Sequence, residues 1–167
     1  NYVLTANVEN ARIYTSAAAN LTGNGLSNVL AAGSGNNVLS GGTGADTADY
    51  SLASSAVAVS LALATVQATG GSGSDRLASI ENLTGSRYND RLSGNAGVNT
   101  LNGGIGIDTM FGGAGNDVYY VDNLSDKVYE TTTTSNTTDA GGIDKVISSV
   151  SFNMAAYSGV SLVENLS

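Results

Sequence analysis

Large apolar side chains recur every nine residues in the middle of the chain. The apolar positions are Leu83, Leu92, Leu101, Met110 and Tyr119. A glycine follows two residues after each of the first four, at Gly85, Gly94, Gly103 and Gly112. An acid or its amide stands two residues before each of the last four, at Asp90, Asn99, Asp108 and Asp117. Four consecutive matches at one spacing indicate a repeat architecture.

Each repeat divides into a turn and a very short strand. In the best copies the turn reads Gly-Gly-x-Gly-x-Asp, over 103–108 and 112–117, and its residues tolerate positive φ. The three residues that follow, such as 109–111, have one large apolar residue in the middle, which we expect to point inward. Alternating strands and turns predict an all-β coil with two repeats per full turn and two parallel sheets that face each other.

This winding places turns that are two repeats apart on the same edge of the coil. Asp90 then lies over Asp108, and Asn99 lies over Asp117. Stacked carboxylates repel one another, and glycine-rich turns expose carbonyl oxygens, so each edge is expected to bind a hard divalent cation. Calcium fits better than magnesium because its coordination is looser. The chain has no His and no Cys, so a zinc or copper site would lack its usual ligands.

The segments GGTGADTAD, GGIGIDTMF and GGAGNDVYY resemble the RTX, or haemolysin-type, calcium-binding nonapeptide repeat. The resemblance is strongest over 39–47, 70–76 and 101–118, and weaker where Asn replaces Asp. It implies a parallel β-roll, which is a right-handed β-solenoid. It also implies a protein that a Gram-negative bacterium exports by type I secretion to the medium or to the cell surface.

Other segments flank or interrupt the repeats. We expect one module with N-terminal cap strands over 1–20, the first part of the roll over 21–47, an inserted β excursion over 48–69, the second part of the roll over 70–118, and capping strands with the start of the next module over 119–167. The excursion is predicted from 56–64, where Val and Leu alternate with small residues as in a half-buried strand.

A second motif also recurs. Val8-Glu9-Asn10 near the start of the chain returns as Val163-Glu164-Asn165 near its end, with a third copy at Ile80-Glu81-Asn82. A chain that ends on the motif it began with favours one module cut from a tandem array. Glu9, Glu81 and Glu164 precede Asn in each case, and we expect this pair to hydrogen-bond a backbone kink.

The register across the excursion decides which turns meet. If the hand of the coil is unchanged, one edge carries Asn28, Asp46, Asp90 and Asp108, and the other carries Asn37, Asp75, Asn99 and Asp117. The expected ion-binding pairs are then Asp46 with Asp90, Asp90 with Asp108, Asp75 with Asn99, and Asn99 with Asp117. Asn28 and Asn37 offer one neutral oxygen each, so their turns should bind calcium weakly or close by hydrogen bonds.

The expected calcium ligands are the glycine carbonyls and the acids or amides of these turns. They are Gly42, Gly44, Asp46, Gly71, Gly73, Asp75, Asp90, Asn99, Gly104, Gly106, Asp108, Gly113, Gly115 and Asp117. Asp122 and Asp126 are further candidates that would close the last site at the end of the roll. Asp139 and Asp144 are interpreted as surface charges.

Composition supports a fold that depends on bound metal. The 167 residues include 22 Gly but only two Phe, two Met and no Trp, so little apolar area can be buried at roughly 25 cal/mol per Å². We infer that calcium binding supplies the missing stability. The net charge of −8 argues against nucleic acid and membrane insertion, and roughly four calcium ions would cancel it.

These observations predict a module without catalytic activity. No nucleophile–His arrangement can form without His, and calcium turns explain the stacked Asp pairs more simply than a glycosidase does. We expect a module that folds on calcium after secretion and serves as a structural, stabilising or adhesive segment of a large extracellular protein, next to neighbouring modules of the same chain.

The alternative is a module that binds a polysaccharide or cell-surface glycan and is attached to a secreted carbohydrate-active enzyme or adhesin. Its contacts would come from outward strand positions, namely Arg91, Thr100, Asn102 and Thr109. Ice binding is not expected, because the outward turn positions hold no regular file of Thr and Asn.

Overall fold

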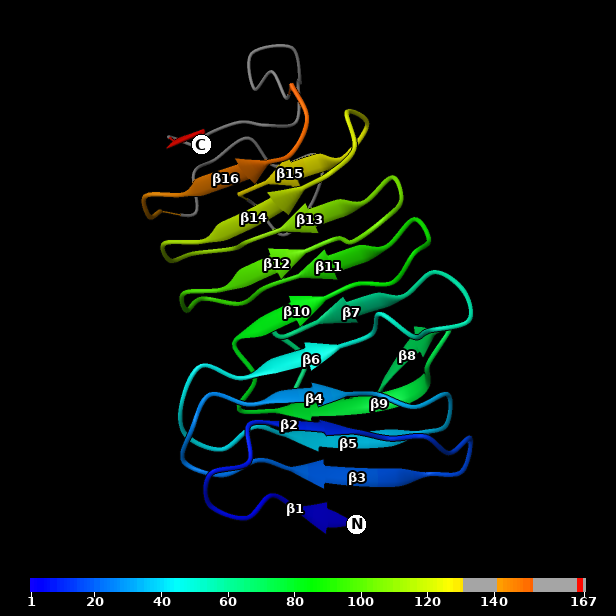
Figure 1. Ribbon diagram of the computed structural model, residues 1–167. Coiled ribbons are helices and arrows are strands. Elements are labelled where there is room, and N and C mark those ends of the chain that lie inside the picture. Colours follow the sequence, from blue (N-terminus) through cyan, green and yellow to red (C-terminus); the bar gives the residue numbers. More distant parts are fainter. Residues whose placement is uncertain (131–140, 152–164, 167) are drawn as a thin grey trace.

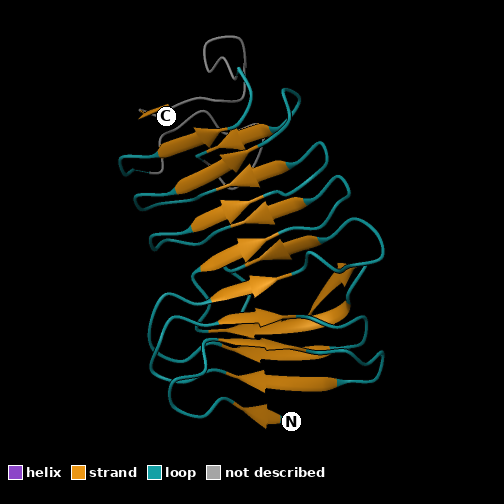
Figure 2. Ribbon diagram, in the orientation of Figure 1, coloured by secondary structure: helices purple, strands orange, loops and turns teal. Residues whose placement is uncertain are grey.

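The computed structural model describes residues 1–130, 141–151, 165 and 166. Every regular element among these residues is a strand, and none of them forms a helix that could span a membrane. The strands wind into a flattened coil with two walls, and turns line its two edges (Figures 1 and 2). The predicted parallel β-roll is therefore confirmed.

The first wall is a single eight-stranded parallel sheet. In sheet order it contains β2 (Asn10–Arg12), β4 (Val29–Ala31), β6 (Thr47–Asp49), β10 (Asn82–Thr84), β12 (Thr100–Asn102), β14 (Val118–Val121), β16 (Lys145–Ser148) and β17 (Asn165–Leu166). Consecutive members of the regular part, such as β12 and β14, stand 18 residues apart, with Thr100 beside Val118. One full turn of the coil therefore contains two nine-residue repeats.

The second wall consists of two sheets. The five-stranded sheet contains β1 (Tyr2–Val3), β3 (Ala19–Thr22), β5 (Asn37–Ser40), β9 (Gly73–Ala78) and β8 (Gln67–Gly70). The four-stranded sheet contains β7 (Ala58–Ser60), β11 (Arg91–Ser93), β13 (Thr109–Phe111) and β15 (Lys127–Tyr129). All pairs in these sheets are parallel except β8 with β9.

The core is the narrow space between the two walls. Each three-residue strand sends its middle side chain inward, as alternation along a strand requires. The first wall supplies Leu30, Ala48, Leu83, Leu101, Tyr119 and Val146, and the second wall supplies Leu21, Leu39, Leu77, Val59, Leu92, Met110 and Val128. None of them is more than 5% exposed. The predicted inward positions at 83, 92, 101, 110 and 119 are confirmed.

The segment expected to be an excursion is built differently. The strand predicted over 56–64 is β7, and it lies inside the second wall, paired with β11. The added element is the antiparallel hairpin of β8 and β9, which returns the chain so that β9 pairs with β5. The next strand of the first wall, β10, then pairs with β6. The hairpin thus resets the register of every later turn.

This register contradicts two of the expected pairs. Asp46 lies on the edge that leads into the first wall, whereas Asp90 lies on the opposite edge, because Asp90 precedes β11. The residue stacked on Asp46 is Glu81. Asp75 likewise lies on the edge opposite to Asn99. The predicted pairs of Asp46 with Asp90 and of Asp75 with Asn99 are wrong, because the hairpin adds residues that do not follow the nine-residue period.

The coil also continues through the segments expected to cap it. β1 and β2 pair in parallel with β3 and β4, and β14, β15 and β16 extend the two walls toward the C-terminus. Asp139, in the segment 131–140, and Glu164, in the segment 152–164, lie with the whole of both segments outside the described residues. The division of the chain into one module and the start of the next stays a prediction.

The core ladder gives a direct test of the packing. Leu101→Ala removes a fully buried side chain and should lower the free energy of unfolding by about 2–5 kcal/mol in saturating calcium. Ile105→Ala, in the same repeat, is the matched control, because Ile105 is 71% exposed; we expect a change within about 0.5 kcal/mol. Chemical denaturation measures both variants, and equal losses would contradict the inward assignment.

Candidate metal centre

The turn of each coil ends in a residue that we call the slot residue, two positions before the inward apolar residue of the next strand. On the edge that leads into the first wall the slot residues are Asn28, Asp46, Glu81, Asn99, Asp117 and Asp144. On the edge that leads into the second wall they are Asn37, Asp75, Asp90, Asp108 and Asp126. All of them are buried except Glu81, which is half-buried. Two columns of acidic and amide side chains therefore run along the roll.

A regular hydrogen bond joins successive slot residues. Asp108 Oδ1 accepts the backbone N–H of Asp90 at 2.7 Å, and Asp117 Oδ1 accepts that of Asn99 at 2.8 Å. The same bond links the backbone N–H of Asn28 to Asp46 at 2.7 Å. The predicted stacking of Asp90 with Asp108 and of Asn99 with Asp117 is confirmed. One carboxylate oxygen of each slot aspartate is thus engaged by the coil before it.

We call a turn closed when a side-chain oxygen of its slot residue, either the amide oxygen of Asn or the second carboxylate oxygen of Asp, accepts a backbone N–H of the same turn. Asn99 Oδ1 accepts the backbone N–H of Asn95 at 2.8 Å, and its amide nitrogen donates to the carbonyl of Glu81 at 2.8 Å. Asn28, Asn37, Asp90 and Asp126 are held in the same way by amides of their own turns. The turns of Asn28 and Asn37 therefore close by hydrogen bonds, which was one of the two outcomes expected for them.

Open turns lack this bond. Asp46, Asp108 and Asp117 are fully buried, and their Oδ2 atoms have no hydrogen-bond partner within the described part of the chain. All three turns have the full Gly-Gly-x-Gly-x-Asp sequence, which the hairpin turn over 70–75 also carries. Their second and third glycines have positive φ, between 82° at Gly104 and 153° at Gly106. A buried carboxylate oxygen without a partner is costly, so these turns are the positions that need a further ligand.

Backbone carbonyls of the coil before lie against the open turns. A Cβ added at Gly115 would stand 2.6 Å from the carbonyl oxygen of Gly97, and one at Gly44 would stand 2.7 Å from that of Leu26. Only glycine permits this approach. Each open turn, with its unpartnered aspartate, therefore faces the carbonyl oxygens of a closed turn. Carboxylate and carbonyl oxygens in a flexible turn are the ligands that calcium prefers, so the residues present fit a calcium ion.

The electrostatics of the columns agree with this arrangement. Burial raises the pKa of Asp108 to about 7, and the neighbouring carboxylates of Asp126 and Asp90 add to the rise. Burial also raises the pKa of Asp117 to about 7, with a contribution from Asp144. The pKa of Asp126 is raised as well, again mainly by burial. The charged forms of these groups are therefore disfavoured in the fold unless positive charge is supplied.

A family model matches the same turns. The description of the family is "RTX calcium-binding nonapeptide repeat (4 copies)", and the matches cover residues 22–51, 77–110 and 93–128. This chain belongs to the RTX calcium-binding repeat family. Comparison of the chain with curated proteins finds no match. The RTX repeats make the roll a calcium-binding module, while the assignment of individual ligands and the number of ions stay predictions.

Two slot residues were missed or misread in the sequence. Asp144, interpreted as a surface charge, is completely buried, and its Oδ1 accepts the backbone N–H of Asp117 at 2.7 Å. Glu81 Oε2 accepts the backbone N–H of Asp46 at 2.8 Å, so the expectation that it bonds backbone is confirmed, but it does so as a slot residue of the RTX column. Both stand two positions before an inward apolar residue, Leu83 or Val146, and that spacing was the available signal.

The remaining candidate ligands, in the turn over 70–75 and at Asp122 and Asp126, lie outside the open turns. The turn from Gly70 to Asp75 is the β8–β9 hairpin turn, and Asp75 Oδ1 accepts the backbone N–H of Asn37 at 2.7 Å. Asp75 Oδ2 also accepts the Thr69 hydroxyl. Asp122 is exposed, and only its backbone N–H reaches Asp126. None of these turns presents the unpartnered oxygen of an open turn, although their role as ligands stays a prediction.

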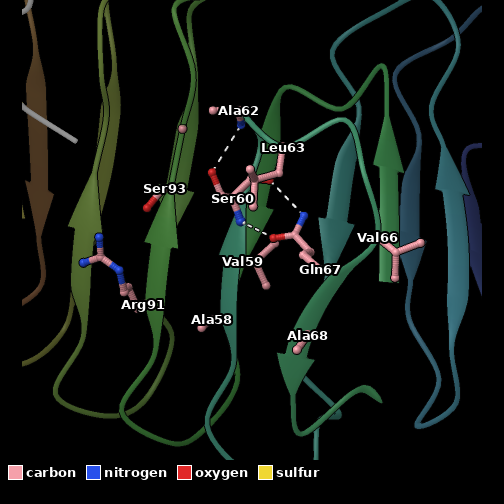
Figure 3. A pocket seen from close by; sticks show the side chains of 11 residues that line it. Ala58, Val59, Ser60, Ala62, Leu63, Val66, Gln67, Ala68, Arg91 and Ser93 are labelled. Atoms are coloured by element: carbon pink, nitrogen blue, oxygen red, sulfur yellow. Dashed lines mark hydrogen bonds between the residues drawn. The ribbon is translucent and has the colours of Figure 1, made fainter. Parts of the chain in front are cut away.

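A groove of about 510 Å³ lies where the hairpin meets the second wall (Figure 3). The side chain of Gln67 bonds both backbone groups of Ser60, at 2.7 and 2.9 Å, and so ties β8 to β7. The lining is mostly small and apolar, with Arg91 at one side and no carboxylate. The lining therefore carries no negative side chain that would attract a cation.

The positions expected for glycan binding do not form one surface. Thr100 and Asn102 lie on the first wall, in β12, whereas Arg91 and Thr109 lie on the second wall, in β11 and β13. The guanidinium of Arg91 lies 3.9 Å from the ring centre of Phe111. The four side chains therefore face away from the roll in two different directions.

The raised pKa values predict an unusual pH dependence for the metal-free protein. An Asp in an unfolded chain has a pKa of about 3.9, so between about pH 4 and pH 7 the folded state binds more protons than the unfolded state through Asp108 and Asp117. Stability must then fall as the pH rises through this window. Urea denaturation of the metal-stripped protein from pH 5 to pH 8 should show the loss.

Saturating calcium provides the control for this experiment. Calcium binds the deprotonated carboxylates, so the calcium-loaded protein should become more stable over the same range of pH. Metal-free stability that stays constant or increases from pH 5 to pH 8 would contradict the burial of these two carboxyl groups.

Proposed function

We propose that this chain is a calcium-dependent structural segment of a large extracellular protein, and that it folds into its roll when it meets calcium outside the cell. The observation that carries the proposal is the set of buried carboxylate oxygens without partners, on Asp46, Asp108 and Asp117. The cost of burying them is removed by a cation that binds the folded turns and not the unfolded chain.

The magnitude of this linkage is comparable with that of folding itself. A site whose ligand is present at 100 times its Kd adds about 2.7 kcal/mol of stability. Three open turns would therefore add on the order of 8 kcal/mol. Whole domains are stable by only about 5–15 kcal/mol, and this core contains few large side chains. Calcium would then decide whether the roll is folded.

The proposed location follows from the same linkage. RTX repeats are typically found in secreted proteins, and calcium sites of extracellular modules have Kd values of about 10⁻⁴–10⁻³ M. Sites of that strength stay empty inside a cell and fill outside it. The net charge of −8 would favour the extended chain until calcium neutralises it. Export before folding, as in type I secretion, is compatible with both properties.

A structural role requires no catalytic group. The walls end in strands whose edges can be continued by further coils, because each coil contacts only its neighbours in such a fold. Neighbouring modules of the same chain are the partners that we propose for these ends. The segment would act as a stiff, calcium-stabilised spacer in an adhesive or surface-attached protein.

The test is the calcium dependence of folding. Metal-stripped protein at pH 7.5 should show little β signal by circular dichroism and a large radius of gyration by small-angle X-ray scattering. Calcium should restore both between about 10⁻⁴ and 10⁻³ M, and equal concentrations of magnesium should not. A metal-free chain that is already compact and rich in β structure, with an unchanged melting temperature, would refute the proposal.

A pair of charge-matched variants separates site binding from general charge neutralisation. Asp108→Asn with Asp117→Asn removes two open-turn carboxylates and should shift the calcium midpoint upward at least tenfold. Asp49→Asn with Glu9→Gln removes the same charge from Asp49, which lies outside the slots, and from Glu9, whose side chain is exposed, and should leave the midpoint unchanged. Equal midpoints in the two double variants would mean that net charge alone controls folding.

A further inference from the structure

Three carboxylates meet at the C-terminal end of one turn column. Asp117 precedes β14, Asp144 precedes β16, and Glu130 follows β15. Each offers a carboxylate oxygen, and these oxygens lie within 4.8 Å of one another. The exposed fractions of the three residues are 0%, 0% and 1%. Glu130, at the end of a strand of the second wall, therefore places a carboxylate beside the column of slot residues that lead into the first wall.

Glu130 stands where the repeat requires glycine. Gly94 and Gly112 occupy the same position 36 and 18 residues earlier, directly after the strands β11 and β13. A Cβ added at Gly112 would collide with Asp117 Oδ2 and with the Tyr119 hydroxyl. The turn that begins at Glu130 is longer, since Asp144 follows Asp117 by 27 residues instead of 18. Glu130 therefore places a carboxylate where the corresponding glycines of other turns leave no room for a side chain.

Hydrogen bonds hold this cluster in shape. The Tyr119 hydroxyl donates to Glu130 Oε1 at 2.6 Å, and Asp144 Oδ1 accepts the backbone N–H of Asp117 at 2.7 Å. Asp117 Oδ2 points into the cluster without a partner among the described residues. This buried, unpartnered oxygen is the second observation that indicates a ligand, beside the convergence of the three acids.

We propose that Asp117, Glu130 and Asp144 form a calcium site of a different composition from those of the repeats, and that its ion ties the two walls together at the C-terminal end of the described roll. The inference rests on the proposed calcium function. Calcium accepts six to eight oxygen ligands, including bidentate carboxylates, whereas magnesium requires near-octahedral geometry with several waters. Three carboxylates in a dry space therefore favour calcium.

The ion has a structural consequence for β15 and β16. Glu130 is attached to β15 and Asp144 to β16, and these strands belong to opposite walls. An ion shared by the two carboxylates would hold the ends of both strands. Without it, hydrogen bonds alone would hold these ends.

The experiment counts calcium ions in the whole chain by native mass spectrometry at saturating calcium. Glu130→Gln should bind one ion fewer than the wild type, and backbone amides of β16 should exchange hydrogen at least tenfold faster. Glu130→Asp keeps the carboxylate and should retain the ion with weaker affinity. Asp49→Asn, which removes an acid outside the slots, is the matched control and should keep the wild-type count.

A second measurement does not depend on the folding of these variants. Terbium replaces calcium at oxygen sites and emits when a nearby tyrosine is excited, and the Tyr119 hydroxyl is bonded to Glu130. Tyr119→Phe should lower the sensitised emission at least twofold while the number of bound ions stays the same. Unchanged emission would overturn the site.

The outcomes separate this inference from the proposed function. Equal, non-zero ion counts in the wild type and in Glu130→Gln would overturn the three-carboxylate site and leave the repeat sites intact. In that case, the Glu130 carboxyl group would only form hydrogen bonds with its neighbours. No bound calcium in either protein would overturn the proposed function and this inference together.

Discussion

The structure depends on one bond that is repeated along both edges of the roll: a buried carboxylate oxygen accepts a backbone N–H from the coil before it. The bond from Asp90 to Asp108, at 2.7 Å, is an example. It satisfies an amide that a three-residue strand cannot engage in its own ladder. This bond is costly because it buries a negatively charged carboxylate in a protein with a thin core, and the second carboxylate oxygen still needs a partner.

The turns meet this cost in two ways. Where the slot residue is Asn, as at Asn99, the side chain is neutral and bonds its own turn. In three of the four Gly-Gly-x-Gly-x-Asp turns, those of Asp46, Asp108 and Asp117, the second oxygen stays buried without a partner among the described residues. Each open turn lies one coil after a closed turn. Closed turns can form without metal, so folding would require calcium only at the open turns.

Much of the roll could be predicted because its spacing is local. Leu92 and Leu101 point inward, and Asp117 stacks on Asn99, since each follows from a nine-residue period. The register across the β8–β9 hairpin could not be predicted, because the hairpin returns the chain by a number of residues that no periodicity specifies. Asp144 was accessible in principle from its spacing before Val146, and Glu130 from its position 18 residues after Gly112, but no period predicts that the two carboxylates meet.

The most direct measurement is the anomalous scattering of calcium in crystals grown with the ion. The account predicts strong peaks beside the Oδ2 atoms of Asp46, Asp108 and Asp117, against the carbonyl oxygens of the preceding turn. It predicts no peak confined to the closed turns of Asn28 or Asn37, whose side chains are already hydrogen-bonded. Empty open turns in fully ordered, calcium-saturated crystals would contradict the claim that these buried carboxylates exist to bind metal.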